Sequence, residues 1–167
     1  PAAEKVLKNE RSSSAYIFYW GIKKTFSNLH LHNIFFSKNY REEFDHLFVK
    51  KKFYDDPTIY VNITSKMEMD HAPGDSENWF VMVNAPAHTE MDWVAQRSAL
   101  RQHVIAKLNR MLSTNLNELI EVEEVELRKS MGYTNAHIFV GDTILKPGQS
   151  DKIKNIENNY SDWFGYF

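Results

Sequence analysis

The chain has 167 residues, of which 43% are hydrophobic and 25% are charged, and its formal net charge at pH 7 is −2. This length and composition predict a single globular domain, residues 1–167, with enough apolar residues for a core. The slightly negative charge argues against a nucleic-acid partner, which normally meets a basic face. The absence of cysteine excludes disulfides and cysteine metal ligands.

Apolar patterns predict three β-strands in the first half of the chain. Residues 12–23 are apolar on both alternating faces, so we expect a strand inside a sheet that is covered on both sides. Residues 32–37 (HNIFFS) form a second candidate strand. Residues 58–64 alternate between branched apolar residues on one face and polar or tyrosine residues on the other, which predicts a third strand.

Two helices are also predicted. Asn39 is expected to cap a short helix, and Asp92 is expected to cap a longer one at about residues 93–112. One face of the short helix comprises Tyr40, Phe44, Leu47 and Phe48. The apolar stripe of the long helix comprises Trp93, Leu100, Val104, Leu108 and Met111, with Arg97, Arg101, Lys107 and Arg110 off the stripe.

Three further strands are predicted at residues 78–86, 119–127 and 137–142. The order strand, strand, helix, strand, strand, helix, strand predicts an α+β fold with a mainly antiparallel sheet covered by helices. The residues expected to be buried are Phe18, Ile34, Val61, Val81, Val104 and Leu108.

Common catalytic and nucleotide-binding motifs (GxGxxG, GxxxxGK[ST], GxSxG and HExxH) are absent from the sequence. His30 and His32 have the i, i+2 spacing that places both imidazoles on one strand face, where a third ligand would complete a zinc site. The simpler interpretation is two polar residues at the start of a strand. The acidic run at residues 121–126 is expected to be a solvated strand edge, the alternative being a carboxylate pair for acid–base work.

Aromatic residues make up 14% of the chain and gather on the predicted strands. Such residues form either a core or one wall of an apolar tunnel. The residues predicted to bind an apolar substrate are Trp20, Phe35, Phe36, Trp79 and Phe80.

Four ordered segments carry a resemblance to a known family: SSSAYIFYWGIKKTF, LHNIFFSKNYREEFDHLF, DDPTIYVNITSK and ENWFVMVNAPA. They resemble the second half of bacterial phytoene-desaturase-type carotenoid desaturases, with the similarity running over residues 12–127 and a divergent tail at 128–167. This resemblance implies the substrate domain of a flavin oxidoreductase. The family consists of FAD-dependent oxidoreductases that dehydrogenate or isomerise long isoprenoid hydrocarbons taken from a membrane.

The resemblance implies that the chain is the substrate-binding portion of such an enzyme. We expect it to be inactive and to hold no FAD when purified alone, because it lacks the glycine-rich turn that cradles a pyrophosphate. The segment HIFVGDTILKPGQS echoes a flavin-contacting segment of the family, which implies a flavin role for Asp142. The alternatives are a stand-alone binding module for an apolar ligand or a protein, without catalysis, and a zinc enzyme using His30 and His32.

The resemblance also implies a cytoplasmic protein that is peripheral at the membrane face, and the net charge argues against a nucleic-acid partner. The C-terminal SDWFGYF is either a membrane contact or a tail folded on the core. Because successive strand residues point to opposite faces, one of Phe35 and Phe36 is expected to face an elongated apolar cavity and the other the core. The polar residues predicted in that cavity are Asn33, Asn62 or Asn84.

Overall fold

The structure is a computed structural model that describes residues 13–87 and 92–128. These residues form an α+β fold built on one five-stranded sheet with strand order β2-β3-β4-β1-β5, in which every neighbouring pair is antiparallel. The strands are β1 (Ser14–Ile22), β2 (His32–Phe35), β3 (Ile59–Asn62), β4 (Glu77–Ala85) and β5 (Ile120–Arg128). The helices are α2 (Tyr40–Phe48), α3 (Trp93–Leu112) and α4 (Leu116–Leu119), with short 3-10 turns η1 (Thr64–Lys66) and η2 (Met69–His71).

The predicted order of strands and helices is confirmed within these residues, and the α+β class with it. The strand predicted at 137–142 and the C-terminal SDWFGYF lie outside the described residues. Asn39 caps α2 as predicted, because its Oδ1 accepts a hydrogen bond from the Glu42 backbone N–H at 3.2 Å.

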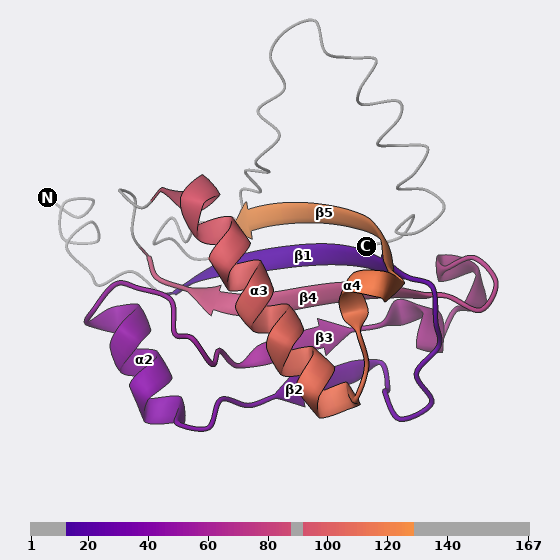
Figure 1. Ribbon diagram of the computed structural model, residues 1–167, viewed down its shortest axis with the longest axis horizontal. Helices are drawn as coiled ribbons and strands as arrows, with labels where there is room; N and C mark the ends of the chain where they lie inside the picture. Colours follow the sequence, from indigo (N-terminus) through magenta and orange to yellow (C-terminus); the bar gives the residue numbers. More distant parts are fainter. Residues whose placement is uncertain (1–12, 88–91, 129–167) are drawn as a thin grey trace, which may run out of the picture.

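Helix α3 lies across the strands and covers one face of the sheet, here called the core face (Figure 1). Side chains from β1, β3 and β4 pack there against Leu100, Val104, Ile105 and Leu108 of α3. This burial explains why β1 is apolar at Tyr16, Phe18, Trp20 and Ile22, which all point to the core face.

Five of the six predicted core residues are buried, but the prediction for Ile34 is wrong, since its side chain is 54% exposed. Strand β2 has only four residues and forms the edge of the sheet. Ile34 pairs with Tyr60 and points away from the core face, while its neighbour Phe35 points into the core. The sequence pattern of β2 did not reveal which of its two faces was covered.

Two residues of α3 also differ from their predicted positions. Met111 is half exposed in the last turn, where α3 reaches the β2 edge of the sheet (Figure 1). Lys107 was predicted to lie off the apolar stripe, yet it is buried. It follows Leu100 by seven residues and therefore lies on the same face of the helix. Its charge suggested an outward position, but its helical position places it inward.

The buried ammonium group of Lys107 joins α3 to the loops on both sides of α2. Its Nζ donates to the carbonyl oxygens of Phe36 at 2.9 Å and Pro57 at 2.8 Å, and it lies 3.0 Å from Oδ1 of Asp56. Burial tends to raise the pKa of Asp56, but the hydrogen bond from the Lys38 backbone N–H and the Lys107 charge outweigh it, so this pKa is lowered.

We expect Asp56→Asn to lower the free energy of unfolding at pH 7 by about 2–4 kcal/mol, because Lys107 would remain buried without a counter-ion. Because its pKa is lowered by folding, Asp56 contributes stability above the unfolded carboxyl pKa of about 4, and this contribution is lost as the pH falls through the folded pKa. Urea unfolding at several pH values measures both effects. The matched control is Asp55→Asn, whose side chain is exposed and should change stability by less than about 0.5 kcal/mol. Equal losses in the two variants would contradict this role of Asp56.

Candidate functional site

The side of the sheet opposite α3, here called the second face, carries an apolar surface. Ile17 and Tyr19 of β1 are buried there, and Phe80 of β4 packs its ring against Tyr19 at 5.6 Å between centroids. Tyr60 of β3 extends the row, with its ring 6.2 Å from that of Phe80. The other partly buried residues of this cluster are Ala15, Met82 and Val122. Within the described residues, no helical side chain belongs to this cluster.

The register of the sheet explains why these side chains meet. Tyr19 lies opposite Phe80 and Ile17 lies opposite Met82 in the β1–β4 pair, and Met82 lies opposite Tyr60 in the β3–β4 pair. Residues that are directly opposite on neighbouring strands share a face. The apolar alternation of β1 and β4 on this side therefore produces one continuous surface across three strands.

Polar groups mark the β2 edge of the second face. The ring of His32 lies beside that of Tyr60, with Nδ1 of His32 2.8 Å from the Tyr60 hydroxyl oxygen and 3.2 Å from Nδ2 of Asn62. Asn62 also donates to the Leu31 carbonyl oxygen. These groups contact one another, so they form a polar margin of the apolar surface.

A carboxyl group lies at the other edge of this face. Glu124 of β5 is directly opposite Tyr19 in the β1–β5 pair. Burial raises the pKa of Glu124, the charge of Arg97 opposes this, and the neighbouring Glu123 raises it further. The prediction that the acidic run lies at a strand edge is confirmed within the described residues, because β5 is the last strand of the sheet that they form. Its members are not uniformly solvated, however, since Glu123 and Glu124 are only partly exposed.

The five residues predicted to bind substrate do not share one surface. Trp20 and Trp79 are fully buried in the core, and Phe35 lies there too. Phe80 lies on the second face, and Phe36 is 63% exposed at the end of β2. Only Phe80 and Phe36 are therefore positioned where a ligand could touch them without a rearrangement of the core. A substrate role for any of the five stays a prediction.

Phe35 and Phe36 lie in different environments, since Phe35 is buried and Phe36, just past the end of β2, is exposed. Phe35 faces the core, whereas the exposed ring of Phe36 lies 6.2 Å from that of Tyr40 on α2. The residues predicted to wall an apolar cavity beside Phe36, 16–20 and 78–83, lie on β1 and β4, whereas Phe36 follows the edge strand β2. A shallow pocket of about 170 Å³ occurs between α3 and α4, lined by Arg101, Gln102, Ile105, Ala106, Asn109 and Asn117.

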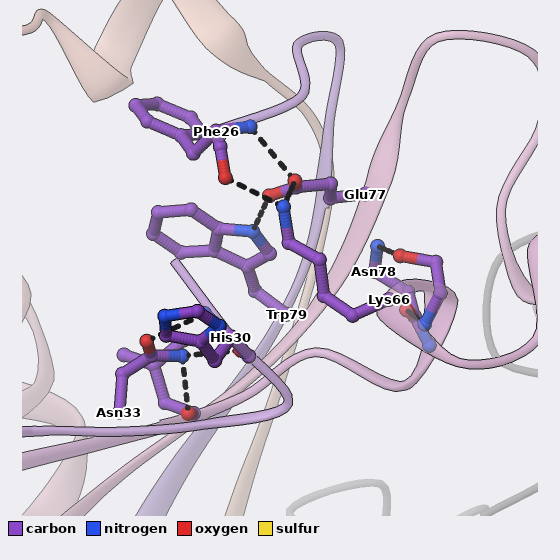
Figure 2. Close-up of polar contacts among 9 residues, drawn as sticks. Phe26, His30, Asn33, Lys66, Glu77, Asn78 and Trp79 are labelled. Carbon is purple, nitrogen blue, oxygen red and sulfur yellow. Dashed lines mark hydrogen bonds and ion pairs between the residues drawn. The ribbon is translucent and has the colours of Figure 1, made fainter. Parts of the chain in front are cut away.

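A buried carboxylate that the sequence did not reveal lies at the start of β4 (Figure 2). Glu77 accepts hydrogen bonds at 2.8 Å from the Phe26 backbone N–H and from the indole N–H of Trp79, and it forms an ion pair with Lys66. Lys66 in turn donates to the Phe26 carbonyl oxygen at 2.6 Å. Because every partner belongs to the protein, this cluster fixes the loop after β1 against η1 and β4.

Glu123 has a comparable structural role on the core side of β5. Its Oε2 accepts from the indole N–H of Trp20 at 2.7 Å and from Nε of Arg101 at 2.6 Å. This arrangement satisfies a buried indole and ties α3 to the edge strand. The alternating charges of this strand in the sequence gave no indication that the Glu123 side chain points to the core face.

The zinc hypothesis required His30 and His32 on one strand face, and this placement is wrong. His30 lies in the loop before β2, where its backbone N–H donates to Oδ1 of Asn33 and its carbonyl oxygen accepts from Nδ2 of Asn33 (Figure 2). In the part of the chain that the structure describes, no group of three His, Asp or Glu side chains is arranged to hold a metal ion.

Among residues 13–87 and 92–128, no helix combines the length and the apolarity needed to span a bilayer. Asp142, to which a flavin role was assigned, lies outside the described residues.

The chain is homologous to carotenoid desaturases, although no family model matches it. It is 51% identical over 124 residues to the 1-hydroxycarotenoid 3,4-desaturase of a Flavobacterium species, a match that covers 74% of this chain and 25% of the relative. It is 35% identical over 129 residues to the 4,4'-diapolycopene oxygenase of a Methylomonas species, covering 74% of this chain and 26% of the relative.

A third relative is the zeta-carotene-forming phytoene desaturase of Myxococcus xanthus, which is 29% identical over 172 residues and is matched by 93% of this chain. The match covers 33% of that relative. The chain thus spans about a quarter to a third of the length of these relatives. The resemblance found in the sequence is confirmed as similarity to one portion of these longer proteins.

Proposed function

We propose that this chain is the substrate-binding portion of a carotenoid-desaturase-like, FAD-dependent oxidoreductase, and that the second face of the sheet lies against the isoprenoid hydrocarbon. The observation that supports this proposal is the apolar row formed by Tyr19, Phe80 and Tyr60, in which Tyr19 is buried and the rings of Phe80 and Tyr60 are partly exposed. A long hydrocarbon offers no hydrogen bonds, so its binding requires a continuous apolar surface. The relatives named as desaturases of carotenoids and phytoene supply the chemical class of the substrate.

The described residues do not fit a flavin dinucleotide. Their only two glycines are Gly21, inside β1, and Gly74, in the loop before β4, so they form no glycine-rich turn between a strand and a helix. The first turn of α2 is already closed by Asn39. We therefore assign the redox step to FAD held outside these residues, and we assign to them the binding of the hydrocarbon and the exclusion of water.

We also propose that the protein is cytoplasmic and meets the membrane peripherally. An isoprenoid hydrocarbon dissolves in lipid rather than in water, because each buried methylene group gains about 0.8 kcal/mol. An enzyme that binds such a substrate has direct access to it when the enzyme lies at the bilayer surface.

The first test of the second face is Met82→Gln. We expect about a tenfold weaker affinity for an acyclic carotenoid delivered from detergent, because an amide that loses water to an apolar ligand costs about 1–3 kcal/mol. Quenching of tryptophan fluorescence by the carotenoid measures the affinity. The matched control is Met111→Gln on α3, a half-exposed methionine away from this face, which should bind as the unmodified protein does.

Equal affinities of both folded variants and the unmodified protein would remove the second face from the proposal. Uptake of the carotenoid together with turnover in the absence of flavin would contradict the assignment of the redox step to FAD.

A further inference from the structure

Helix α2 and Phe36, three residues before its cap Asn39, carry a row of aromatic side chains, here called the α2 stripe: Phe36, Tyr40, Phe44 and Phe48. The ring centroids of successive members are 6.2, 4.7 and 5.6 Å apart. Their spacing of four residues places the helical members on one face of α2. Phe36 and Tyr40 are more than half exposed, and the following Val49 is 72% exposed. In Figure 1, α2 lies at the periphery of the molecule, to the left of the strands.

The stripe is held on a fixed backbone. Lys107 binds the Phe36 carbonyl oxygen, and the Ser37 backbone N–H donates to Oγ1 of Thr58. The buried carboxylate of Glu43, on the inner side of α2, accepts from both the backbone N–H and the hydroxyl of Thr58 at 2.8 and 2.6 Å. The exposed rings therefore belong to an anchored element, because its inner side is fixed by buried polar contacts and by Leu47.

Cationic side chains flank the stripe. In the part of the chain that the structure describes, Lys38, Arg41, Lys51 and Lys52 form no ion pair, and Lys50 pairs with Asp45 at 3.0 Å. Among the acidic residues of α2, Glu43 is buried, Asp45 pairs with Lys50, and Glu42 is exposed but contacts Asn39 and Tyr54. The exposed surface around the rings therefore has an apolar centre, and the cationic side chains that flank it outnumber the exposed carboxylate of Glu42.

We propose that the α2 stripe docks the protein on an anionic lipid bilayer, with the aromatic rings in the headgroup region and the flanking lysine and arginine side chains on lipid phosphates. This inference rests on the proposed function in one respect, namely that the substrate is a hydrocarbon stored in lipid. The charge complementarity favours a bilayer, since each cationic side chain near an anionic surface contributes about 1 kcal/mol. A helix with an exposed aromatic face and basic flanks is also the pattern of interfacial helices.

Co-sedimentation of the whole chain with vesicles of phosphatidylcholine and phosphatidylserine tests this docking. We expect the double variant Phe36→Ser/Tyr40→Ser to bind these vesicles at least about tenfold more weakly, because two exposed rings no longer enter the interface. Both positions are largely exposed, so folding should be preserved, as circular dichroism would show. The matched control is Met67→Ser/Met69→Ser, which removes two apolar side chains that are even more exposed but lie outside the stripe, and it should bind as the unmodified chain does.

A second pair of variants tests the charges. Lys38→Gln/Arg41→Gln should weaken binding to the anionic vesicles several-fold, whereas Lys23→Gln/Lys24→Gln, on exposed lysines after β1, should not. The docking proposal is overturned if the stripe variant binds vesicles normally, which would move the contact to another segment such as SDWFGYF. It is also overturned if the unmodified chain does not bind vesicles and instead self-associates through the stripe. In that case the stripe variant would lose the self-association.

The carotenoid titration distinguishes failure of this inference from failure of the proposed function. A chain that binds the carotenoid through the second face but ignores anionic vesicles would refute docking alone. A chain that binds vesicles through the stripe but takes up no carotenoid would refute the proposed function and leave docking in place.

Discussion

Replacing Glu77 with glutamine is expected to lower the free energy of unfolding by about 2–4 kcal/mol. The amide keeps the shape of the side chain but offers only one acceptor oxygen, whereas the carboxylate serves the Phe26 N–H, the Trp79 indole and Lys66. A buried donor would lose its partner, and the Lys66 ammonium group would lose its counter-ion. Urea unfolding, monitored by tryptophan fluorescence, measures the change.

Two further variants make this result specific. Glu68→Gln, at an exposed position next to η2, should change stability by less than about 0.5 kcal/mol. Lys66→Met combined with Glu77→Gln should cost less than the sum of the two single changes by about 1 kcal/mol or more, because the second change removes the ion left unpaired by the first. Additive losses would mean that Lys66 and Glu77 do not act as a pair.

Leu108→Ala is expected to lower the free energy of unfolding by about 2–5 kcal/mol, because it opens a cavity where α3 meets the core face. Leu108 is fully buried among side chains of the sheet and α3. The control Met111→Ala, one turn further along the same helix and half exposed, should cost far less. A change below about 0.5 kcal/mol for Leu108→Ala would mean that the packing of α3 is misassigned.

Much of the fold could be predicted because periodicity reports secondary structure directly. The 3.6-residue spacing of Leu100, Val104 and Leu108 predicted α3 at about residues 93–112, and the structure places the helix at Trp93–Leu112. The alternation at residues 58–64 likewise predicted β3, which the structure places at Ile59–Asn62. The side-chain amide of Asn39 predicted the start of α2 through a local hydrogen bond. These signals depend only on neighbours along the chain.

The candidate site was harder to predict because it depends on which strands become neighbours. The apolar pattern of β1 indicated two covered faces, but it did not reveal that α3 takes the side of Trp20 and leaves Tyr19 on the other. Trp20 and Trp79 were predicted to bind substrate, yet each indole donates to a carboxylate within the domain. Those acceptors, Glu123 and Glu77, become visible only when strands distant in sequence are paired.

The polar contacts that hold α2 also join residues that are distant in the sequence. Lys107 and Glu43 have the charge of surface residues in the sequence, and both are buried in the structure. Each is satisfied by groups from other elements, Lys107 by the carbonyl oxygens of Phe36 and Pro57 and Glu43 by Thr58. No local pattern identifies such partners, so the sequence predicted Lys107 to lie off the apolar stripe and gave no indication that Glu43 is buried.

We propose that this chain binds the hydrocarbon while FAD is held elsewhere. The decisive measurement is the absorbance spectrum of the purified chain, recorded before and after titration with an acyclic carotenoid. We expect no flavin absorbance before the titration, because the described residues provide no dinucleotide cradle. During the titration we expect saturable uptake of the carotenoid, with its absorption bands shifted because the polyene enters an apolar site. Stoichiometric flavin in the purified protein, or a carotenoid that stays unbound at every concentration, would contradict this proposal.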